Sequence, residues 1–372
     1  MSSVLEGIRV LDFGRYIAGP YCAALLADMG AEVIRIEKRE GSEDRTLIPV
    51  MHETDGSPGA GALFLQMNRN KKGLTLDPAH PKGRDVVKRL IKTADVVVVN
   101  LPPQTLRHLG LDWENVHAIN PRTILTTASA FGSGGPYEER LGFDGVAQAM
   151  SGAVYMAGTP EQPVRAAASW VDFGTASLAA FGTMTALFAR EKTGRGQHVE
   201  GALLRTAVTF MSQTLVEQAV LKKDRVATLN RGQTAGPSDI FKCKDGWITI
   251  LVNGNPLFKR IAKMMGEEAW LTDPRYHRRS PRRQRRDPER TLRQMVRSPH
   301  GRRSPRPTRS RQSPRRPHPV PATTPRRPAR EGRQLLRRNH LPRPRRQSPN
   351  PGDAHHPLRN PRHHPPRPAG TR

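Results

Sequence analysis

Residues 7–37 of the chain read GIRVLDFGRYIAGPYCAALLADMGAEVIRIE. Two short apolar runs rich in β-branched residues, 7–13 and 31–37, flank a periodic apolar segment over 21–29. That segment opens after Gly19-Pro20 and closes at Gly30, and proline near a helix start with glycine past its end marks helix boundaries well. The pattern predicts a strand, a helix and a second strand, with the two strands paired in parallel through a right-handed crossover.

The same alternation continues along the chain. We predict a helix over 81–94, strands over 95–100 and 123–128, and helices over 174–191 and 202–221. The unbroken valine run 96–99 is typical of a strand buried on both faces of a sheet. Asp245-Gly246 predicts a hairpin turn. The fold class that follows is α/β, a doubly wound parallel-sheet large domain with a smaller α+β domain.

The composition changes abruptly after residue 276. Residues 277–372 contain 29 arginines against four acidic residues, with no lysine, isoleucine, Phe, Trp or Tyr, whereas residues 1–276 carry a net charge of only +3. A segment this poor in apolar residues cannot offset the entropy of ordering a core. We therefore expect a disordered Arg/Pro-rich tail over 277–372, with the composition of a GC-rich gene read out of frame.

Three regions are predicted on this basis. Residues 1–220 form a Rossmann-like large domain, residues 221–276 begin a small domain that is truncated, and residues 277–372 are the tail. Clustered arginines bind phosphate backbones without sequence preference, so an Arg-rich nucleic-acid-binding protein is one function class that the tail supports. The tail has no aromatic side chain to stack on bases, which weakens this hypothesis.

Several other classes of protein are disfavoured. Two cysteines cannot form a disulfide-rich scaffold, no apolar run approaches the length of a membrane span, and the N-terminus shows no secretory signal. We therefore expect a cytoplasmic protein. Glu37 ends the second strand, where nicotinamide-binding proteins place a ribose-binding acid. However, the turn over 14–20 is not G-x-G-x-x-G, so nicotinamide binding is disfavoured.

Short segments over residues 4–276 resemble the family III coenzyme A transferases, the family of formyl-CoA:oxalate and carnitine CoA-transferases. Each segment is a weak signal alone, but together they follow the order of the family. The segments are LEGIRVLD (5–12), AGP (18–20), GAEVIRIE (30–37), NRNKKGLTLD (68–77), ADVVVVN (94–100), NPR (120–122), GSGGP (132–136), FDGVAQAMSG (143–152), KTGRGQ (192–197), DGW (245–247) and DPRY (273–276). The resemblance ends near Tyr276, where the composition changes.

The resemblance implies that coenzyme A passes between an acyl-CoA thioester and a carboxylic acid through a covalent aspartyl intermediate. The matching segment WVDFGTA (170–176) implies Asp172 as the nucleophile. Coenzyme A is then a substrate, and neither a permanently bound cofactor nor a metal is expected. We expect an ionised Asp172 whose charge is favoured by amide groups at a helix N-terminus. The alternative is that Asp172 merely caps the helix over 174–191.

The resemblance also implies a set of residues that bind coenzyme A or the acyl substrate. The alternative for each lysine and arginine among them is an ordinary solvated surface charge. Ile17 stands where the formyl transferase has a glutamine, which disfavours formate and oxalate as substrates, and His108 stands where that enzyme has an arginine. The full set is Ile17, Ala18, Lys38, Arg39, Lys71, Lys72, Leu76, Asp77, Asn100, Leu101, Pro102, His108, Gly142, Phe143, Asp144, Gly232 and Gly236.

Acyl-CoA racemases share this fold and many of these segments, and are the alternative enzyme class. They use a histidine where this chain has Phe143, which cannot take a proton, so racemisation is disfavoured. The family forms interlocked homodimers, and a homodimer is therefore expected. The family's C-terminal portion is absent from this reading frame, so we expect the 372-residue chain to be poorly active or inactive.

Overall fold

The computed structural model describes residues 3–52, 58–222, 224–273 and 293. Its core is a six-stranded sheet in which every pairing is parallel. The strands are β1 (Arg9–Asp12), β2 (Glu32–Glu37), β5 (Lys71–Thr75), β6 (Val96–Val99), β7 (Ile124–Ser129) and β8 (His198–Ala202). Their spatial order is β5-β2-β1-β6-β7-β8. The predicted α/β class with a doubly wound parallel sheet is confirmed, and the strand order reverses direction between β1 and β6, where such folds bind ligands.

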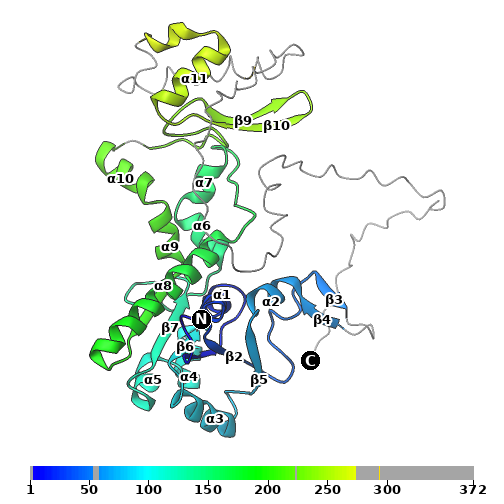
Figure 1. Cartoon of the computed structure of the whole chain (residues 1–372), viewed down its shortest axis with the longest axis vertical. Coiled ribbons are helices and arrows are strands. Elements are labelled where there is room, and N and C mark those ends of the chain that lie inside the picture. Colours follow the sequence, from blue (N-terminus) through cyan, green and yellow to red (C-terminus); the bar gives the residue numbers. More distant parts are fainter. Residues whose placement is uncertain (1–2, 53–57, 223, 274–292, 294–372) are drawn as a thin grey trace, which may run out of the picture. The chain divides into compact units, whose positions relative to one another are not determined.

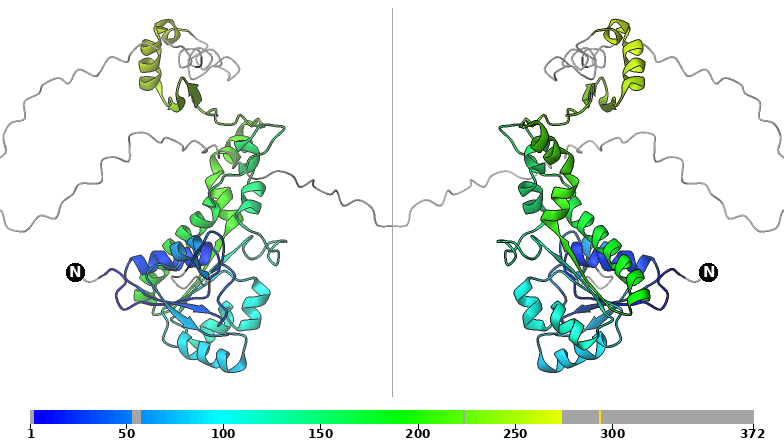
Figure 2. Two further views of the ribbon diagram at one scale, coloured as in Figure 1. Left: turned by 90° about the vertical axis from the view of Figure 1, so that its right-hand side faces the viewer. Right: turned by 90° about the vertical axis from the view of Figure 1, so that its left-hand side faces the viewer.

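Helices cover both faces of this sheet (Figures 1 and 2). One face carries α1 (Ala18–Asp28) and α8 (Trp170–Thr193), and the other carries α3 (Pro81–Ile91), α4 (Pro103–Leu109) and α5 (Trp113–Ile119). Figure 2 shows α1, in dark blue, and the cyan helices on opposite sides of the strands. In β6, Val96 and Val98 pack into the first layer while Val97 and Val99 pack into the second. Successive side chains of a strand point to opposite faces of the sheet, and both faces are covered here. Every position of β6 is therefore buried, which explains the unbroken valine run.

The 24-residue helix α8 is the main support of the site. Its buried face is built from small residues, including Ala176, Ala179 and Ala180, which lets α8 pack closely on α1. The helix ends at Gly194, whose φ of 68° is left-handed and suits glycine. By length and composition α8 could also span a membrane, a criterion that the core helices of soluble proteins meet as well. Our expectation that no segment has such a length and composition was therefore wrong for α8.

Shorter elements complete the described chain. The predicted hairpin forms, but its turn is one residue earlier than predicted, at Lys244 and Asp245, and Gly246 begins the second strand. The hairpin packs Phe241 against Val252 and Ile261. The remaining elements are β3 (Val50–His52), β4 (Pro58–Gly61), α2 (Ala62–Met67), α6 (Asp144–Met150), α7 (Ala153–Ala157), α9 (Leu203–Phe210), α10 (Ser212–Leu221), β9 (Ser238–Cys243), β10 (Gly246–Leu251), α11 (Asn255–Met265) and a 3₁₀ turn (Glu268–Leu271).

The structure departs from the predicted elements at several points. The two edge strands β5 and β8 were not predicted, because their exposed polar positions break the apolar pattern of a buried strand. The helix predicted over 174–191 begins four residues earlier, at Trp170. The helix predicted over 202–221 is two helices, which meet at Met211. The domain boundary at 220–221 remains a prediction. Apart from Arg293, the predicted tail over 277–372 lies outside the described residues.

A group of buried charges fixes the carboxyl ends of β1 and β2. The Arg35 side chain is 3% exposed, and its guanidinium lies 3.6 Å from Asp12, 3.3 Å from Glu37 and 3.1 Å from Asp44. Lys71 reaches the same Asp12 carboxylate at 2.8 Å. Each buried charge is therefore matched by an opposite one, which is the condition for keeping charges out of water.

Removal of Arg35 should be costly, because it leaves the Asp44 and Glu37 carboxylates partly uncompensated in the interior. We expect Arg35→Met to lower the free energy of unfolding by about 3–5 kcal/mol. Arg69→Met, which breaks a surface pair with Asp28, should cost at most about 1 kcal/mol. Urea denaturation of the two variants measures both values, and equal losses would contradict the assigned role of Arg35.

Candidate active site

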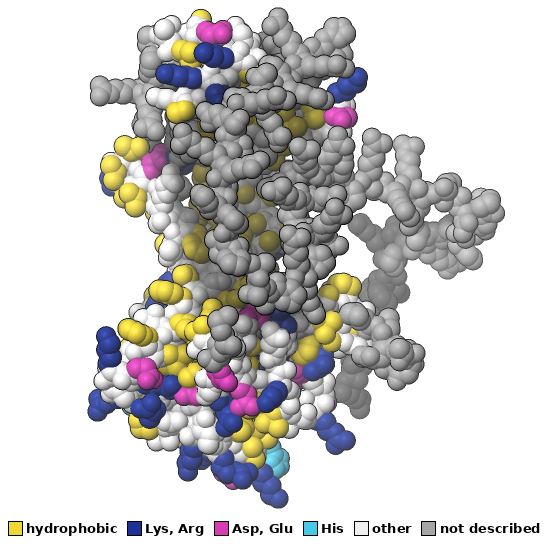
Figure 3. Space-filling model, in the orientation of Figure 1, with side chains coloured by type: hydrophobic (Ala, Val, Ile, Leu, Met, Phe, Trp, Pro, Cys, Tyr) yellow, Lys and Arg dark blue, Asp and Glu magenta, His cyan; other side chains and the backbone are white. Residues whose placement is uncertain are grey.

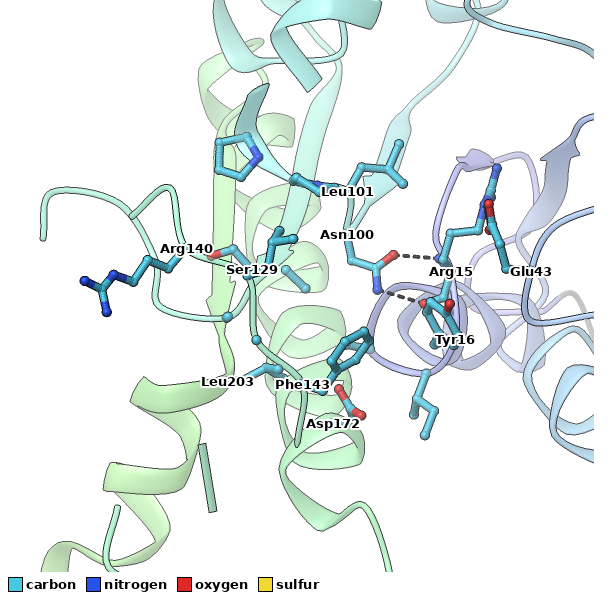
Figure 4. Close-up of a pocket in the computed structure, with 18 residues that line it drawn as sticks. Arg15, Tyr16, Glu43, Asn100, Leu101, Ser129, Arg140, Phe143, Asp172 and Leu203 are labelled. Carbon is cyan, nitrogen blue, oxygen red and sulfur yellow. Dashed lines mark hydrogen bonds and ion pairs between the residues drawn. The ribbon is translucent and has the colours of Figure 1, made fainter. Parts of the chain in front are cut away.

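A cavity of about 380 Å³ lies where the strand order reverses, at the carboxyl ends of β1 and β6. Its wall is formed by the β1–α1 loop, the segments that follow β6 and β7, and the residues that lead into α6 (Figure 4). Asp172 of α8 contributes the only carboxylate besides Glu43 to the described lining. The lining residues are Arg15, Tyr16, Ile17, Ala18, Glu43, Asn100, Leu101, Pro102, Pro103, Ala128, Ser129, Ala130, Arg140, Leu141, Gly142, Phe143, Asp172 and Leu203.

The side chain of Asn100 holds the β1–α1 loop against the end of β6. The Arg15 N–H donates to Asn100 Oδ1 at 2.6 Å, and Asn100 Nδ2 donates back to the Arg15 carbonyl at 2.8 Å. Gly14 is required here, because a Cβ atom would lie 2.7 Å from Cδ of Pro20 and 2.8 Å from Oδ1 of Asp12. The backbone of the loop therefore packs tightly against the side chain of Asn100.

Asp172 is the third residue of α8, and its half-buried carboxylate faces the cavity (Figure 4). Within the described ranges of the chain, no group donates a hydrogen bond to this carboxylate. Because the helix begins at Trp170, Asp172 lies inside the first turn and does not cap it. The alternative of a mere helix cap is wrong, and the carboxylate is left available to a ligand.

The cap of α8 comes instead from Asp144, the first residue of α6. Its buried carboxylate accepts hydrogen bonds from the backbone N–H groups of Val171 at 2.9 Å and Asp172 at 3.1 Å. The side-chain amide of Gln148 donates to the other oxygen of Asp144. The amide groups that we expected to favour a charge on Asp172 are therefore occupied by a different carboxylate.

This arrangement raises the pKa of Asp172 to about 7. Burial is the largest cause, and the negative charge of Asp144 is the second. Our expectation of a carboxylate that the helix N-terminus keeps ionised was wrong, because a burial penalty and a like charge act without any compensating donor. Near neutral pH the group is divided between its protonated and ionised forms.

Several of the predicted substrate-binding residues share this cavity with Asp172, and these are Ile17, Ala18, Asn100, Leu101, Pro102, Gly142 and Phe143. Asp144 does not line the cavity, and the prediction that it binds coenzyme A or the acyl substrate is corrected. Its carboxylate instead accepts the N–H groups of Val171 and Asp172 at the start of α8. Sequence reasoning missed Arg15, Tyr16 and Ser129. A signal for them existed, because all three lie at the carboxyl end of a predicted strand, where α/β sheets bind ligands.

The predicted cations are in different environments. Lys38 and Arg39 are exposed and line a second hollow, of about 320 Å³, at the carboxyl ends of β2 and β5, together with Arg45. Lys71 was predicted to bind coenzyme A, but its side chain is 1% exposed and its ammonium group donates to Asp12, the Pro20 carbonyl and Asn68. That prediction is corrected: Lys71 neutralises a buried carboxylate.

The other predicted binding residues line neither hollow. Lys72 is on the outer edge of the sheet and pairs with Glu32 at 2.7 Å, and Leu76 packs in the core. Asp77 accepts the Ala79 N–H at 2.9 Å, and His108 lies 3.1 Å from Arg84 on the surface. The last two predicted residues, Gly232 and Gly236, lie in the loop before β9. The Gly232 N–H donates to the Ser238 carbonyl at 2.6 Å. Among the described residues, no group of three potential ligands could hold a metal ion.

Comparison with known proteins identifies the family. The profile of CoA-transferase family III matches residues 5–304. A succinyl-CoA–D-citramalate CoA-transferase from Chloroflexus aurantiacus is 36% identical over 274 residues, which cover 73% of this chain and 67% of that enzyme. A formyl-CoA:oxalate CoA-transferase from Bradyrhizobium sp. is 36% identical over 301 residues, covering 74% and 69%.

A solved structure shows the same fold. The crystal structure of a CAIB/BAIF family protein from Brucella suis is 30% identical, with a TM-score of 0.65, and the match covers 74% of this chain and 73% of that one. The profile match extends beyond residue 276, where we expected the resemblance to end. The profile match, the identity to these relatives and the shared fold agree, and the chain belongs to CoA-transferase family III.

Proposed function

We propose that the chain transfers coenzyme A from an acyl-CoA thioester to a carboxylic acid by way of covalent intermediates on Asp172. The observation that carries this proposal is the Asp172 carboxylate itself, which faces the cavity where the strand order reverses and which no described group binds. A carboxylate without donors has lost part of its solvation, and this makes it a better nucleophile once it is ionised.

The proposed exchange balances without a net gain or loss of protons. An oxygen of ionised Asp172 attacks the thioester carbon, the C–S bond breaks, and CoA thiolate leaves a mixed anhydride behind. The thiolate then attacks the aspartyl carbon, which releases the donor acid and leaves an aspartyl-CoA thioester. The incoming carboxylate attacks that thioester, and the returning thiolate takes up the new acyl group and frees Asp172.

Both hollows support a proposal for how coenzyme A binds. The cavity wall near Asp172 is largely apolar, with Ile17, Phe143 and Leu203, and suits the uncharged arm and acyl part of the thioester. Lys38 and Arg39 supply exposed cations for its phosphate groups. The Phe143 ring beside Asp172 has no group that exchanges a proton, which supports transfer over racemisation.

We further propose that the working unit is a homodimer. Apolar side chains are exposed along α10, where Leu215, Val216, Val220 and Leu221 are 45–72% exposed. Figure 3 shows hydrophobic side chains gathered over this helix. A soluble protein rarely leaves such a row of side chains to water, and a second copy of the chain would bury them.

Replacement of the nucleophile should abolish turnover. In a chain whose reading frame after residue 276 is repaired, we expect Asp172→Ala to reduce CoA transfer by on the order of 1000-fold or more, since the reaction then lacks its nucleophile. Hydroxylamine added during turnover should modify the wild-type peptide that contains Asp172, as detected by mass spectrometry. Asp85→Asn, at an exposed position on α3, is the control. Substantial transfer activity in Asp172→Ala would contradict the proposal.

The raised pKa of Asp172 predicts a pH dependence of activity. Only the ionised carboxylate attacks, so kcat/KM should rise with pH and level off above about pH 7. Initial rates from pH 5 to 9 at low acyl-CoA concentration measure this profile. A profile that is flat across this range would show that an ordinary, unperturbed carboxylate carries the reaction.

The same pKa predicts a pH dependence of stability. It rises from 3.8 to about 7 on folding, so the folded chain binds the proton more tightly and stability falls as pH increases between these values. Asp172→Asn removes this loss. We expect the stability of the variant relative to wild type to increase by on the order of 4 kcal/mol from pH 4 to pH 8, as measured by urea denaturation. A difference that does not change with pH would exclude the raised pKa.

A further inference from the structure

The β1–α1 loop carries a strained residue beside the active-site cavity. Tyr16 has a φ of 59°, a left-handed conformation that a bulky residue adopts only where its surroundings impose it. The Tyr16 N–H donates to Oδ2 of Asp44 at 3.1 Å, and Asp44 is 0% exposed. A buried carboxylate from another segment therefore holds the backbone at the strained position.

Asp44 is itself held in place by Arg35. The guanidinium of Arg35 donates to both carboxylate oxygens of Asp44, at 3.1 and 3.2 Å, and to the Gly14 carbonyl at 2.5 Å. Asn100 binds the N–H and carbonyl groups of Arg15 from the end of β6. The peptide group that joins Arg15 to Tyr16 is thus held at both ends, its carbonyl by Asn100 and its N–H by Asp44.

The held backbone directs an aromatic pair toward the nucleophile. The Tyr16 ring meets the Phe143 ring edge to face, with 5.8 Å between centroids and 89° between planes. Both rings line the same cavity as Asp172, and Figure 4 shows the Phe143 ring beside the Asp172 carboxylate. Phe143 is otherwise 66% exposed, so Tyr16 is the aromatic contact that positions its ring.

We propose that Asp44 is a positioning residue that acts through the Tyr16 backbone to hold the Tyr16–Phe143 ring pair beside Asp172 and keep water from that carboxylate. The inference rests on the proposed function for the role of Asp172 as nucleophile. The exclusion of water from Asp172 by the Tyr16 and Phe143 rings, here called the shelter, is a property of the unliganded protein and can be measured without turnover.

The shelter has a specific electrostatic consequence. Burial is the largest cause of the raised pKa of Asp172, so loss of the ring pair should lower that pKa. The charged groups around Asp172 are Asp144 from α6 and, in the cavity wall, Arg15, Glu43 and Arg140. None of these charges is altered by substitutions at Tyr16, so Tyr16 variants report on solvent access alone.

The test is a carboxyl carbon-13 NMR titration of Asp172, whose resonance is assigned by its loss in Asp172→Asn. We expect Tyr16→Ala, Asp44→Asn and Asp44→Glu each to lower the titration midpoint by about one pH unit. Asp44→Glu keeps the charge that Arg35 requires but moves the carboxylate off the Tyr16 N–H. Tyr16→Phe keeps the ring, and Asp85→Asn removes an exposed charge elsewhere, so both should leave the midpoint unchanged.

Each outcome decides one part of the proposal. An unchanged midpoint in folded Tyr16→Ala would overturn the shelter by the ring pair. A lowered midpoint in Tyr16→Ala combined with unchanged midpoints in the folded Asp44 variants would overturn the role of Asp44. If Asp44→Asn does not fold, Asp44→Glu decides. Failure of the proposed function is distinct, because it appears as residual transfer activity in Asp172→Ala.

Discussion

The carboxylate of Asp144 links the fold of this chain to its chemistry. It accepts the N–H groups of Val171 and Asp172, which no helix carbonyl can reach at the start of α8. Without that cap the first turn of the helix, and with it the position of Asp172, would be free to fray. The interaction that places Asp172 therefore also puts a negative charge beside it, and this charge adds to burial, the larger cause, in raising the pKa of Asp172.

The sheet determines where this pair of carboxylates meets its ligand. The strand order reverses between β1 and β6, so the loops that follow these strands diverge and leave a cavity at their carboxyl ends. Asn100 bridges the two loops, and Arg35 anchors the β1–α1 loop by donating to the Gly14 carbonyl. The cavity thus has a wall fixed by buried charges and a carboxylate from a separate helix, and the proposal of covalent acyl transfer rests on this combination.

Much of the fold could be predicted from the sequence, because local patterns determine it. The strand–helix–strand unit over 7–37 and the valine run of β6 appear as expected, since both are buried on the faces that their periodicity indicates. The edge strands β5 and β8 were missed because one side of each faces water and carries polar residues. Their apolar pattern is too weak to separate a strand from a loop.

The site was less predictable, because its key contacts join distant residues. The sequence predicts that Lys71 is a phosphate-binding cation. In the structure Lys71 is buried because it pairs with Asp12, which lies 59 residues away in the sequence. Asp144 binds the start of α8 across 27 and 28 residues, so neither its capping role nor the raised pKa of Asp172 could be seen locally. By contrast, Asn100 and Ile17 follow predicted strands, and their place at the cavity was predictable from topology.

In the proposed mechanism, Asp172 exchanges an oxygen atom with the substrates in each turnover. This exchange is tested most directly by running the transfer with an acceptor acid labelled with oxygen-18 in both carboxyl oxygens, in unlabelled water, and analysing the peptide that contains Asp172 by mass spectrometry. We expect this peptide to gain oxygen-18. The attack of the incoming carboxylate on the aspartyl-CoA thioester forms a second mixed anhydride, and its bridging oxygen stays on Asp172 when the thiolate takes the acyl group. A donor acid that becomes labelled while the peptide stays unlabelled would show that the acids react directly, without Asp172.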